Sequence, residues 1–189
     1  MPPSSTVIAS SLLETNRRFL AYWLGKLEGE RMPRKARIDP TEMPRLLPDL
    51  VLYERLSTAH FKIRLAGTAV VRRLGVDPTG TNMLDLLAEA SRQPVERALN
   101  RILDEPCAHV SRVRDRYLSG RQAVVEVLRL PLCDEAGEAR FIISSTAETA
   151  DEFVWADPQE RPVLLAELVE QSFFGWSGGD GGELRVAGL

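Results

Sequence analysis

The chain has 189 residues, of which 44% are hydrophobic and 27% charged, and it contains 13 glycines and 12 prolines. This is the composition of an ordinary globular protein that encloses one core without a disulfide or metal to hold it together. No stretch approaches the ~18 uninterrupted apolar residues of a membrane-spanning helix. Cys107 and Cys133 are too far apart in sequence for a zinc or disulfide motif. Collagen-like, membrane-spanning and cystine-rich classes are therefore excluded.

The charge is unevenly distributed along the chain. Residues 148–189 hold 2 basic and 9 acidic residues, a balance of −7, whereas residues 1–147 hold 22 basic and 18 acidic residues, a balance of +4. So small a surplus over 147 residues is not the electrostatic footprint of a nucleic-acid-binding surface. The first ten residues also lack the basic and apolar regions of a secretory signal. We expect a cytoplasmic protein with neither a nucleic-acid nor a membrane partner.

The first predicted element is an amphipathic helix over residues 11–29. Ser11 and Glu14 have the spacing of a capping box, and apolar residues then recur at helical intervals. This broad apolar stripe needs a cover, either the chain's own sheet or a second copy of the chain, and both alternatives stay open. The interface candidates on the stripe are Leu13, Phe19, Leu20, Trp23, Leu24 and Leu27.

Short helices and strands alternate in the middle of the chain. Asp39 is placed to cap a short helix that begins at Pro40, and alternating apolar residues predict strands over 50–56 and 60–67. Further helices are predicted from capping signals and helical spacing over 69–74, 83–87 and from about 91 to 105.

Three long strands follow, over residues 107–118, 121–133 and 139–149, joined by short turns. If Tyr117 pairs with Gln122 and Leu128 with Ile143, period-two alternation brings one set of side chains to the core face. We take that set as candidates for a ligand pocket: His109, Ser111, Val113, Tyr117, Glu126, Leu128, Phe141, Ile143 and Ser145. The opposite face then carries Arg112, Arg114, Arg116, Arg129 and Arg140.

Two features of this sheet have both a functional and a structural interpretation. A buried Glu126 requires a partner or a raised pKa; it either orients a ligand in an apolar pocket or belongs to a buried network with Arg64 or another arginine, unless the register is wrong. The stripe of Arg112, Arg114 and Arg116 is either an interface for an acidic partner, including the chain's own acidic end, or a solvated strand face.

The segment beyond residue 150 combines acidic residues with aromatic ones. An apolar stretch over 163–169 precedes Phe173, Phe174 and Trp176. A disordered tail has little use for aromatic residues, so we expect a docked C-terminal helix, followed by a flexible end over residues 177–183.

The order of these elements is that of the PAS fold. The motifs D-P-x-E-M-P-x-L-L-P-D-L at 39–50, F-K-I-R-L-A-G-T at 61–68 and L-G-V-D-P-T-G at 74–80 resemble a group of short, single-domain bacterial PAS-type proteins of unassigned function. The resemblance implies an α+β fold, with a five-stranded antiparallel sheet, helices on one face and a cavity between them. We expect an N-terminal helix over 1–38, a PAS-like domain over 39–150 and an acidic, aromatic extension over 151–189.

The sequence contains no enzyme motif. His109, Ser111 and Asp115 share one face of a predicted strand, but spacings of ~7 and ~13 Å are too long for a hydrogen-bonded triad. In the PAS family, flavin photosensors carry a reactive cysteine in the short helices and haem sensors a histidine in the long helix. Residues 68–90 contain no cysteine and residues 91–106 no histidine. We therefore expect no haem, flavin or metal, which leaves an unidentified small ligand.

The resemblance implies a non-enzymatic signalling protein that senses a small molecule in an internal cavity, mediates protein contacts in a regulatory pathway, or does both. We expect a homodimer formed through the N-terminal helix, with a signalling protein as a further partner. Two alternatives stay open. One is a pure protein-interaction module with a filled core, and the other is a small α+β-roll enzyme that uses Glu126 or His109.

Overall fold

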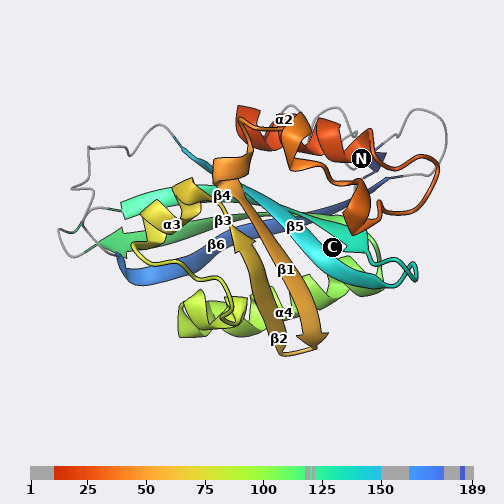
Figure 1. Cartoon of the computed structure of the whole chain (residues 1–189). Coiled ribbons are helices and arrows are strands. Elements are labelled where there is room, and N and C mark those ends of the chain that lie inside the picture. Colours follow the sequence, from red (N-terminus) through yellow and green to blue (C-terminus); the bar gives the residue numbers. More distant parts are fainter. Residues whose placement is uncertain (1–10, 118–119, 121, 150–161, 177–183, 186–189) are drawn as a thin grey trace.

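The computed structural model describes residues 11–117, 120, 122–149, 162–176 and 184–185. One antiparallel sheet, with strand order β2-β1-β5-β4-β3-β6-β7, passes through the middle of the molecule (Figure 1). Its strands are β1 (Leu50–Ser57), β2 (His60–Ala66), β3 (Ala108–Tyr117), β4 (Gln122–Cys133), β5 (Ala139–Glu148), β6 (Pro162–Trp176) and the two-residue β7 (Leu184–Arg185).

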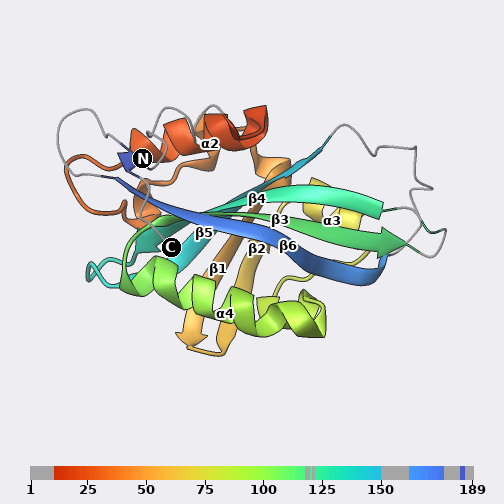
Figure 2. The same cartoon turned by 180° about the vertical axis from the view of Figure 1, so that it is seen from behind.

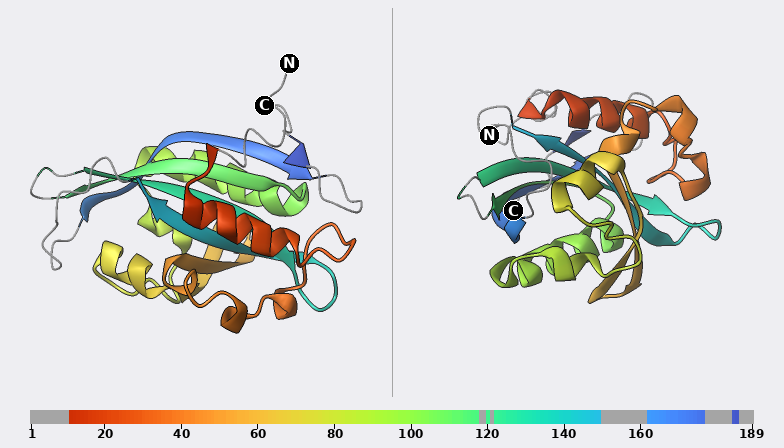
Figure 3. Two further views of the ribbon diagram at one scale, coloured as in Figure 1. Left: turned by 90° about the horizontal axis from the view of Figure 1, so that it is seen from above. Right: turned by 60° about the vertical axis from the view of Figure 1, so that its left-hand side comes forward.

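Helices cover both faces of this sheet. Helix α2 (Glu14–Leu24) lies across one face, and α4 (Glu89–Asp104) lies across the other (Figures 2 and 3). Helix α3 (Thr68–Leu74) and the 3-10 turn η4 (Met83–Leu86) lie between β2 and α4 in the chain. Three more 3-10 turns connect α2 to β1: η1 (Lys35–Arg37), η2 (Pro40–Glu42) and η3 (Leu47–Asp49). We call the two sides of the sheet the α2 face and the α4 face.

The strand register assigns each side chain to one face, because alternate residues of a strand point to opposite sides. Ser111 pairs with Val127 and Arg129 with Ser144, and their side chains lie on the α4 face. Leu128 pairs with Ser145, and both belong to the α2 face. The strands carry apolar side chains on both sides, so each face of the sheet has its own core.

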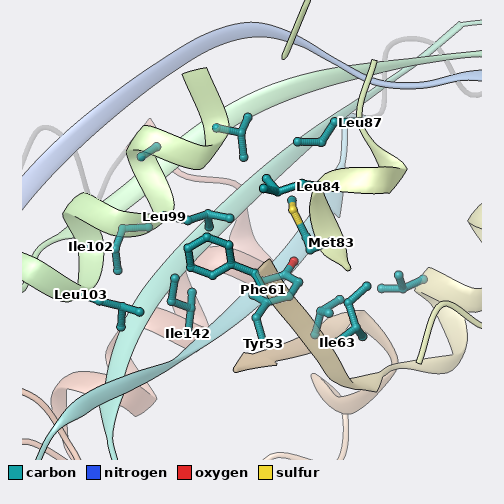
Figure 4. Packing of buried hydrophobic residues seen from close by; sticks show 14 of the residues in the cluster. Tyr53, Phe61, Ile63, Met83, Leu84, Leu87, Leu99, Ile102, Leu103 and Ile142 are labelled. Carbon is teal, nitrogen blue, oxygen red and sulfur yellow. The ribbon is translucent and has the colours of Figure 1, made fainter. Parts of the chain in front are cut away.

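The core of the α4 face forms where α4 and η4 meet the sheet. Phe61 and Ile142 are almost fully buried against Leu99 and Ile102 of α4 (Figure 4). Met83 of η4 packs into the same cluster. Burial of a large apolar side chain stabilises the fold by about 1.5–3 kcal/mol, so this cluster fixes α4 on the sheet.

The core of the α2 face forms under the N-terminal helix. Phe19 and Trp23 of α2 are completely buried together with Leu128 and Phe174 of the sheet. The Trp23 indole Nε1 also donates a hydrogen bond to the carbonyl of Pro131 at 3.1 Å. The helix therefore packs on its own sheet, the first of the two covers that the sequence left open.

Most of the predicted local structure is confirmed. The side chains of Asp39 and Asn82 accept hydrogen bonds from the amides of Thr41 and Leu84, as expected of capping residues. Gly75 ends α3 in the left-handed conformation at φ 68°, which favours glycine. The predicted strands of the sheet are present to within one or two residues at their ends.

The start and end predicted for the N-terminal helix are wrong. The helix runs from Glu14 to Leu24, and the residue before it is Leu13, whose side chain offers no cap. The backbone amide of Leu13 instead donates a hydrogen bond to the Glu126 carboxylate at 2.8 Å. The cap comes from a strand more than a hundred residues away, which no local motif could reveal.

The predicted register between β3 and β4 is wrong by one residue. Gln122 pairs with Arg116 rather than with Tyr117, and Glu126 with Arg112 rather than with Val113. The amide of Gly120 donates to the carbonyl of Tyr117, and Gly120 has a φ of 85°. A left-handed glycine at this point is typical of a loop one residue longer than a two-residue turn. Each residue of β3 therefore faces the side opposite to the one predicted relative to β4.

The predicted C-terminal helix is also wrong, because this segment forms β6. The sheet consequently has six strands and the short β7 instead of five. Leucine, alanine and glutamate in this segment favour a helix, but the open edge of β3 offers a full row of backbone partners, and such pairing overrides local preference. The expected flexible end over 177–183 lies outside the described residues, and beyond it residues 184–185 pair with Gly175 and Trp176.

Candidate functional site

A cavity lies on the α4 face between the sheet, α3 and η4. Its volume is about 60 Å³. Its wall is mostly aliphatic, with polar groups from four strands and one helix. The apolar lining includes Val51, Ile63, Val70, Met83, Leu87, Val113 and Val127, and the polar lining consists of Tyr53, Arg73, Asp115, Arg129 and Thr146.

Arg129 is the most unusual residue of this lining. Its side chain lies in the middle of the sheet and is 2% exposed. One terminal nitrogen, Nη1, donates to the Ser111 hydroxyl at 2.7 Å and contacts Nδ1 of His109 at 3.3 Å. Burial lowers the pKa of Arg129, and the Tyr53 hydroxyl beside it partly opposes this effect. The Nε atom is buried without a hydrogen-bond partner in the described structure.

His109 belongs to the same buried group. Its Nε2 lies 3.1 Å from the side-chain oxygen of Gln171, and its ring packs against Phe173 at 4.8 Å. Burial and the positive charge of Arg129 lower the pKa of His109 to about 3. His109 is therefore neutral at physiological pH, with a proton on Nε2 for Gln171 and a lone pair on Nδ1 for Arg129.

The neutral state of His109 predicts a loss of stability in acid. An unfolded histidine binds a proton below pH 6.5, whereas the folded one does so only near pH 3, so stability falls as the pH drops between these values. We expect this residue alone to cost about 2 kcal/mol of unfolding free energy at pH 5, at about 1.4 kcal/mol per pH unit. In urea titrations at pH 7.5 and 5, His109→Gln should lose that part of the pH dependence. His60→Gln, at the exposed histidine, should keep it, and parallel behaviour of the two variants would contradict the prediction.

The cavity wall also contains an ion pair, formed by Asp115 and Arg73. Asp115 is completely buried and accepts from Arg73 Nη1 at 2.6 Å and from the backbone amide of Ala166 at 2.8 Å. Ala166 has a positive φ of 46°, so Asp115 also holds an irregular point of β6. This pair is locally neutral, in contrast to Arg129.

The predicted pocket residues divide between the two faces. Val113 lines the cavity, and His109 and Ser111 contact Arg129 behind it. Tyr117 is buried near the end of β3. The remaining candidates belong to the α2 face and line no part of this cavity: Glu126, Leu128, Phe141, Ile143 and Ser145. The shift of one residue between β3 and β4 explains this division.

Because of the same shift, the predicted register did not identify Arg129 and Asp115 as residues of the cavity wall. The predicted register placed Arg129 on the arginine-bearing face, whereas it is buried in the core of the α4 face. Asp115 was considered only as a possible member of a catalytic triad. An arginine within an apolar run, Leu128-Arg129-Leu130, is the one sequence signal that could have identified a buried cation.

Glu126 is buried on the α2 face and has partners. Its carboxylate accepts from the Leu13 amide and from the Asn16 side chain at 3.0 Å, and it lies 3.9 Å from Arg112 Nη2. Arg64 pairs with Glu54 instead. The structural interpretation of Glu126 is therefore confirmed, with Arg112 in place of Arg64. A polar hollow of about 180 Å³ near the start of α2 has Arg112, Glu126 and Glu170 in its lining.

The arginine stripe is covered by the acidic segment of the chain itself. Arg112 pairs with Glu170 at 2.9 Å, and Arg116 and Arg114 approach Glu167 at 2.9 and 3.7 Å. These ion pairs join neighbouring strands, β3 and β6, and are partly exposed. Each such pair contributes about 0–1 kcal/mol, so backbone pairing and the burial of Phe174 provide most of the attachment.

Half of the six apolar interface candidates on and next to α2 are buried within the chain. Phe19, Leu20 and Trp23 are buried against the sheet, whereas Leu13, Leu24 and Leu27 are half-buried. The homodimer stays a prediction, and only the half-buried group offers surface to it.

The described residues contain no group of histidine, cysteine and carboxylate side chains that could hold a metal ion. Both cysteines are free and buried, and burial raises the pKa of Cys107 to about 11. No helix in the described part of the chain is long and apolar enough to cross a membrane.

Comparison with known proteins identifies a family for this chain. A family model described as PAS domain matches residues 12–146, and the sequence matches no curated protein. Similar solved structures include the Vibrio cholera VqmA–ligand–DNA complex, at 14% identity and a TM-score of 0.48 over 59% of this chain and 50% of that chain. An RNA-binding light-oxygen-voltage receptor matches at 17% identity and 0.46, over 61% and 35%. A light-oxygen-voltage domain from a study of a flavin analogue matches at 11% and 0.47, over 59% and 84%. The chain thus spans half of the first protein and about a third of the second.

Proposed function

The chain belongs to the PAS domain family, and from this premise we propose that it is a non-enzymatic sensor that binds a small molecule in the cavity between its sheet, α3 and η4. The observation that carries the proposal is the aliphatic cavity with Arg129 in its wall. A cavity of this kind, mostly apolar with a few polar groups, is the usual form of a small-molecule site. An arginine buried with no acidic partner among the described residues costs stability, which a binding role explains and a purely structural role does not.

Strand β4 connects the cavity with the opposite face of the sheet. In β4, Val127 and Arg129 line the cavity, while Glu126 and Leu128 contact α2 on the opposite face. A ligand that shifts β4 would therefore change how α2 is held. We propose that this change alters contacts with a signalling partner or with a second copy of the chain.

The proposal includes neither catalysis nor nucleic-acid binding. Glu126 is hydrogen-bonded on the face away from the cavity, and His109 is neutral and contacts Arg129 and Gln171. The arginines of β3 already pair with glutamates of β6. Two free cysteines are in keeping with a reducing cytoplasm, where we place the sensor, without haem or flavin.

Native mass spectrometry of the freshly purified full chain tests the proposal. We expect a bound small molecule that is lost on denaturation, and an absorption spectrum of the same sample reports any chromophore. Because the cavity is small, a pure interaction module with a filled core is the second candidate. A protein that is free of ligand and whose melting temperature no small molecule changes would favour that candidate and contradict the sensor.

A further inference from the structure

The cavity carries an unbalanced positive charge. Its polar wall holds two arginines and one carboxylate, because Tyr53 and Thr146 are neutral. Arg73 pairs with Asp115 at 2.6 Å. No carboxylate among the described residues forms an ion pair with Arg129, whose hydrogen-bonding contacts, Ser111, His109 and Tyr53, are uncharged groups. The guanidinium stays protonated in proteins, so the site has a net charge of about +1.

The burial and the partners of the two arginines in this wall can be compared directly. Arg73 has a side chain that is 11% exposed and has received an acidic partner from β3. Arg129 is more deeply buried, at 2% exposed, and its Nε has no partner in the described part of the chain. Removing a charge from water costs several kcal/mol unless an opposite charge compensates it. The described part of the chain does not supply this counter-charge, and we expect a ligand to supply it.

The volume and polarity of the cavity limit the size and the charge of the ligand that it can bind. A volume of about 60 Å³, at ~10–15 Å³ for each water-sized group, holds about four to six heavy atoms. Apart from the charged groups, Tyr53 and Thr146, the wall is apolar and consists mainly of valine, isoleucine, leucine and methionine. A second negative charge would face this aliphatic wall, whereas a short alkyl chain would fit it.

Resting on the proposed function, we propose that the cavity binds a small aliphatic monocarboxylate of about four to six heavy atoms, whose carboxylate is held by Arg129. The planar guanidinium offers paired N–H donors in the geometry that a carboxylate accepts. The neutral His109 and Ser111 hold Nη1 from behind, which fixes the orientation of the fork.

Butyrate and butyramide are matched probes for this inference, because both have six heavy atoms and only one is charged. By isothermal titration calorimetry on the full chain, we expect butyrate to bind saturably and butyramide about tenfold more weakly or worse, as loss of a charge-assisted hydrogen bond predicts. Butyrate should also raise the melting temperature, because it binds the folded state alone.

Arg129→Met should abolish the preference for butyrate over butyramide. Replacing an uncompensated buried charge by an apolar side chain does not by itself destabilise a core, so this variant is expected to fold. Arg129→Lys keeps the charge without the fork and should bind butyrate more weakly while still preferring it to the amide. Arg45→Met, at an exposed arginine, is the matched control and should behave as the wild type.

Equal affinity for the two probes, or an Arg129→Met variant that still prefers butyrate, would overturn the inference. Native mass spectrometry separates this failure from that of the proposed function. A bound neutral molecule that butyrate does not displace would contradict the carboxylate ligand and leave the sensor intact. A ligand-free protein that binds neither probe would contradict both.

Discussion

Replacing Asp115 by asparagine is expected to lower the free energy of unfolding by about 3–5 kcal/mol, the usual cost of breaking a buried ion pair from one side. Asparagine has the same size and still offers an oxygen to the Ala166 amide, but it leaves the nearly buried Arg73 without its partner. Urea denaturation monitored by tryptophan fluorescence measures the effect.

Asp104→Asn is the matched control, because Asp104 pairs with Arg55 at the same 2.6 Å but its side chain is 59% exposed. We expect a loss below about 1 kcal/mol for this exposed pair. If the stranded charge of Arg73 is the cause, the double variant Asp115→Asn/Arg73→Met should recover part of the lost stability. Equal small losses in the two single variants would show that the buried pair has no special weight.

Replacing Phe174 by alanine is expected to cost about 3–5 kcal/mol of unfolding free energy, as for other fully buried phenylalanines. Phe174 is completely buried among residues of α2 and the central strands, and it fixes β6 to the rest of the sheet. Thermal unfolding followed by circular dichroism would measure a lower melting temperature. A chain ending at Thr149 lacks β6 altogether and should lose more stability than the point variant does.

Val169→Ala provides the control on the same strand, since Val169 is 46% exposed, and it should change stability by about 0.5 kcal/mol or less. The loss in Phe174→Ala should be nearly the same in low and high salt, because the exposed ion pairs between β3 and β6 contribute little. A strongly salt-dependent loss would mean that these ion pairs, and not apolar burial, hold β6 in place.

A sheet covered on both faces gives the molecule two distinct chemical environments. The α4 face encloses the cavity with Arg129, and the α2 face holds the Glu126 carboxylate at the start of α2. Adjacent residues of β4 contact the two environments, so a single strand connects the cavity with the N-terminal helix.

The sequence by itself determined the elements whose signals are local. Capping by Asp39 and Asn82, the left-handed Gly75 and the alternation in β2 depend on residues a few positions apart, and the structure confirms them. The family could also be predicted, because its motifs at 39–50, 61–68 and 74–80 are contiguous. These features need no knowledge of what lies across the sheet.

Only the tertiary structure decided which side chains form the site. A loop one residue longer than expected near Gly120 reverses the faces of β3 relative to β4, since side chains alternate with a period of two. That reversal separates Glu126 from His109 and brings Arg129 to Ser111. Likewise, the segment Pro162–Trp176 forms a strand because it pairs with the edge of β3. Register and edge pairing depend on contacts distant in sequence, and the physical environment of Arg129 exists only once those contacts have formed.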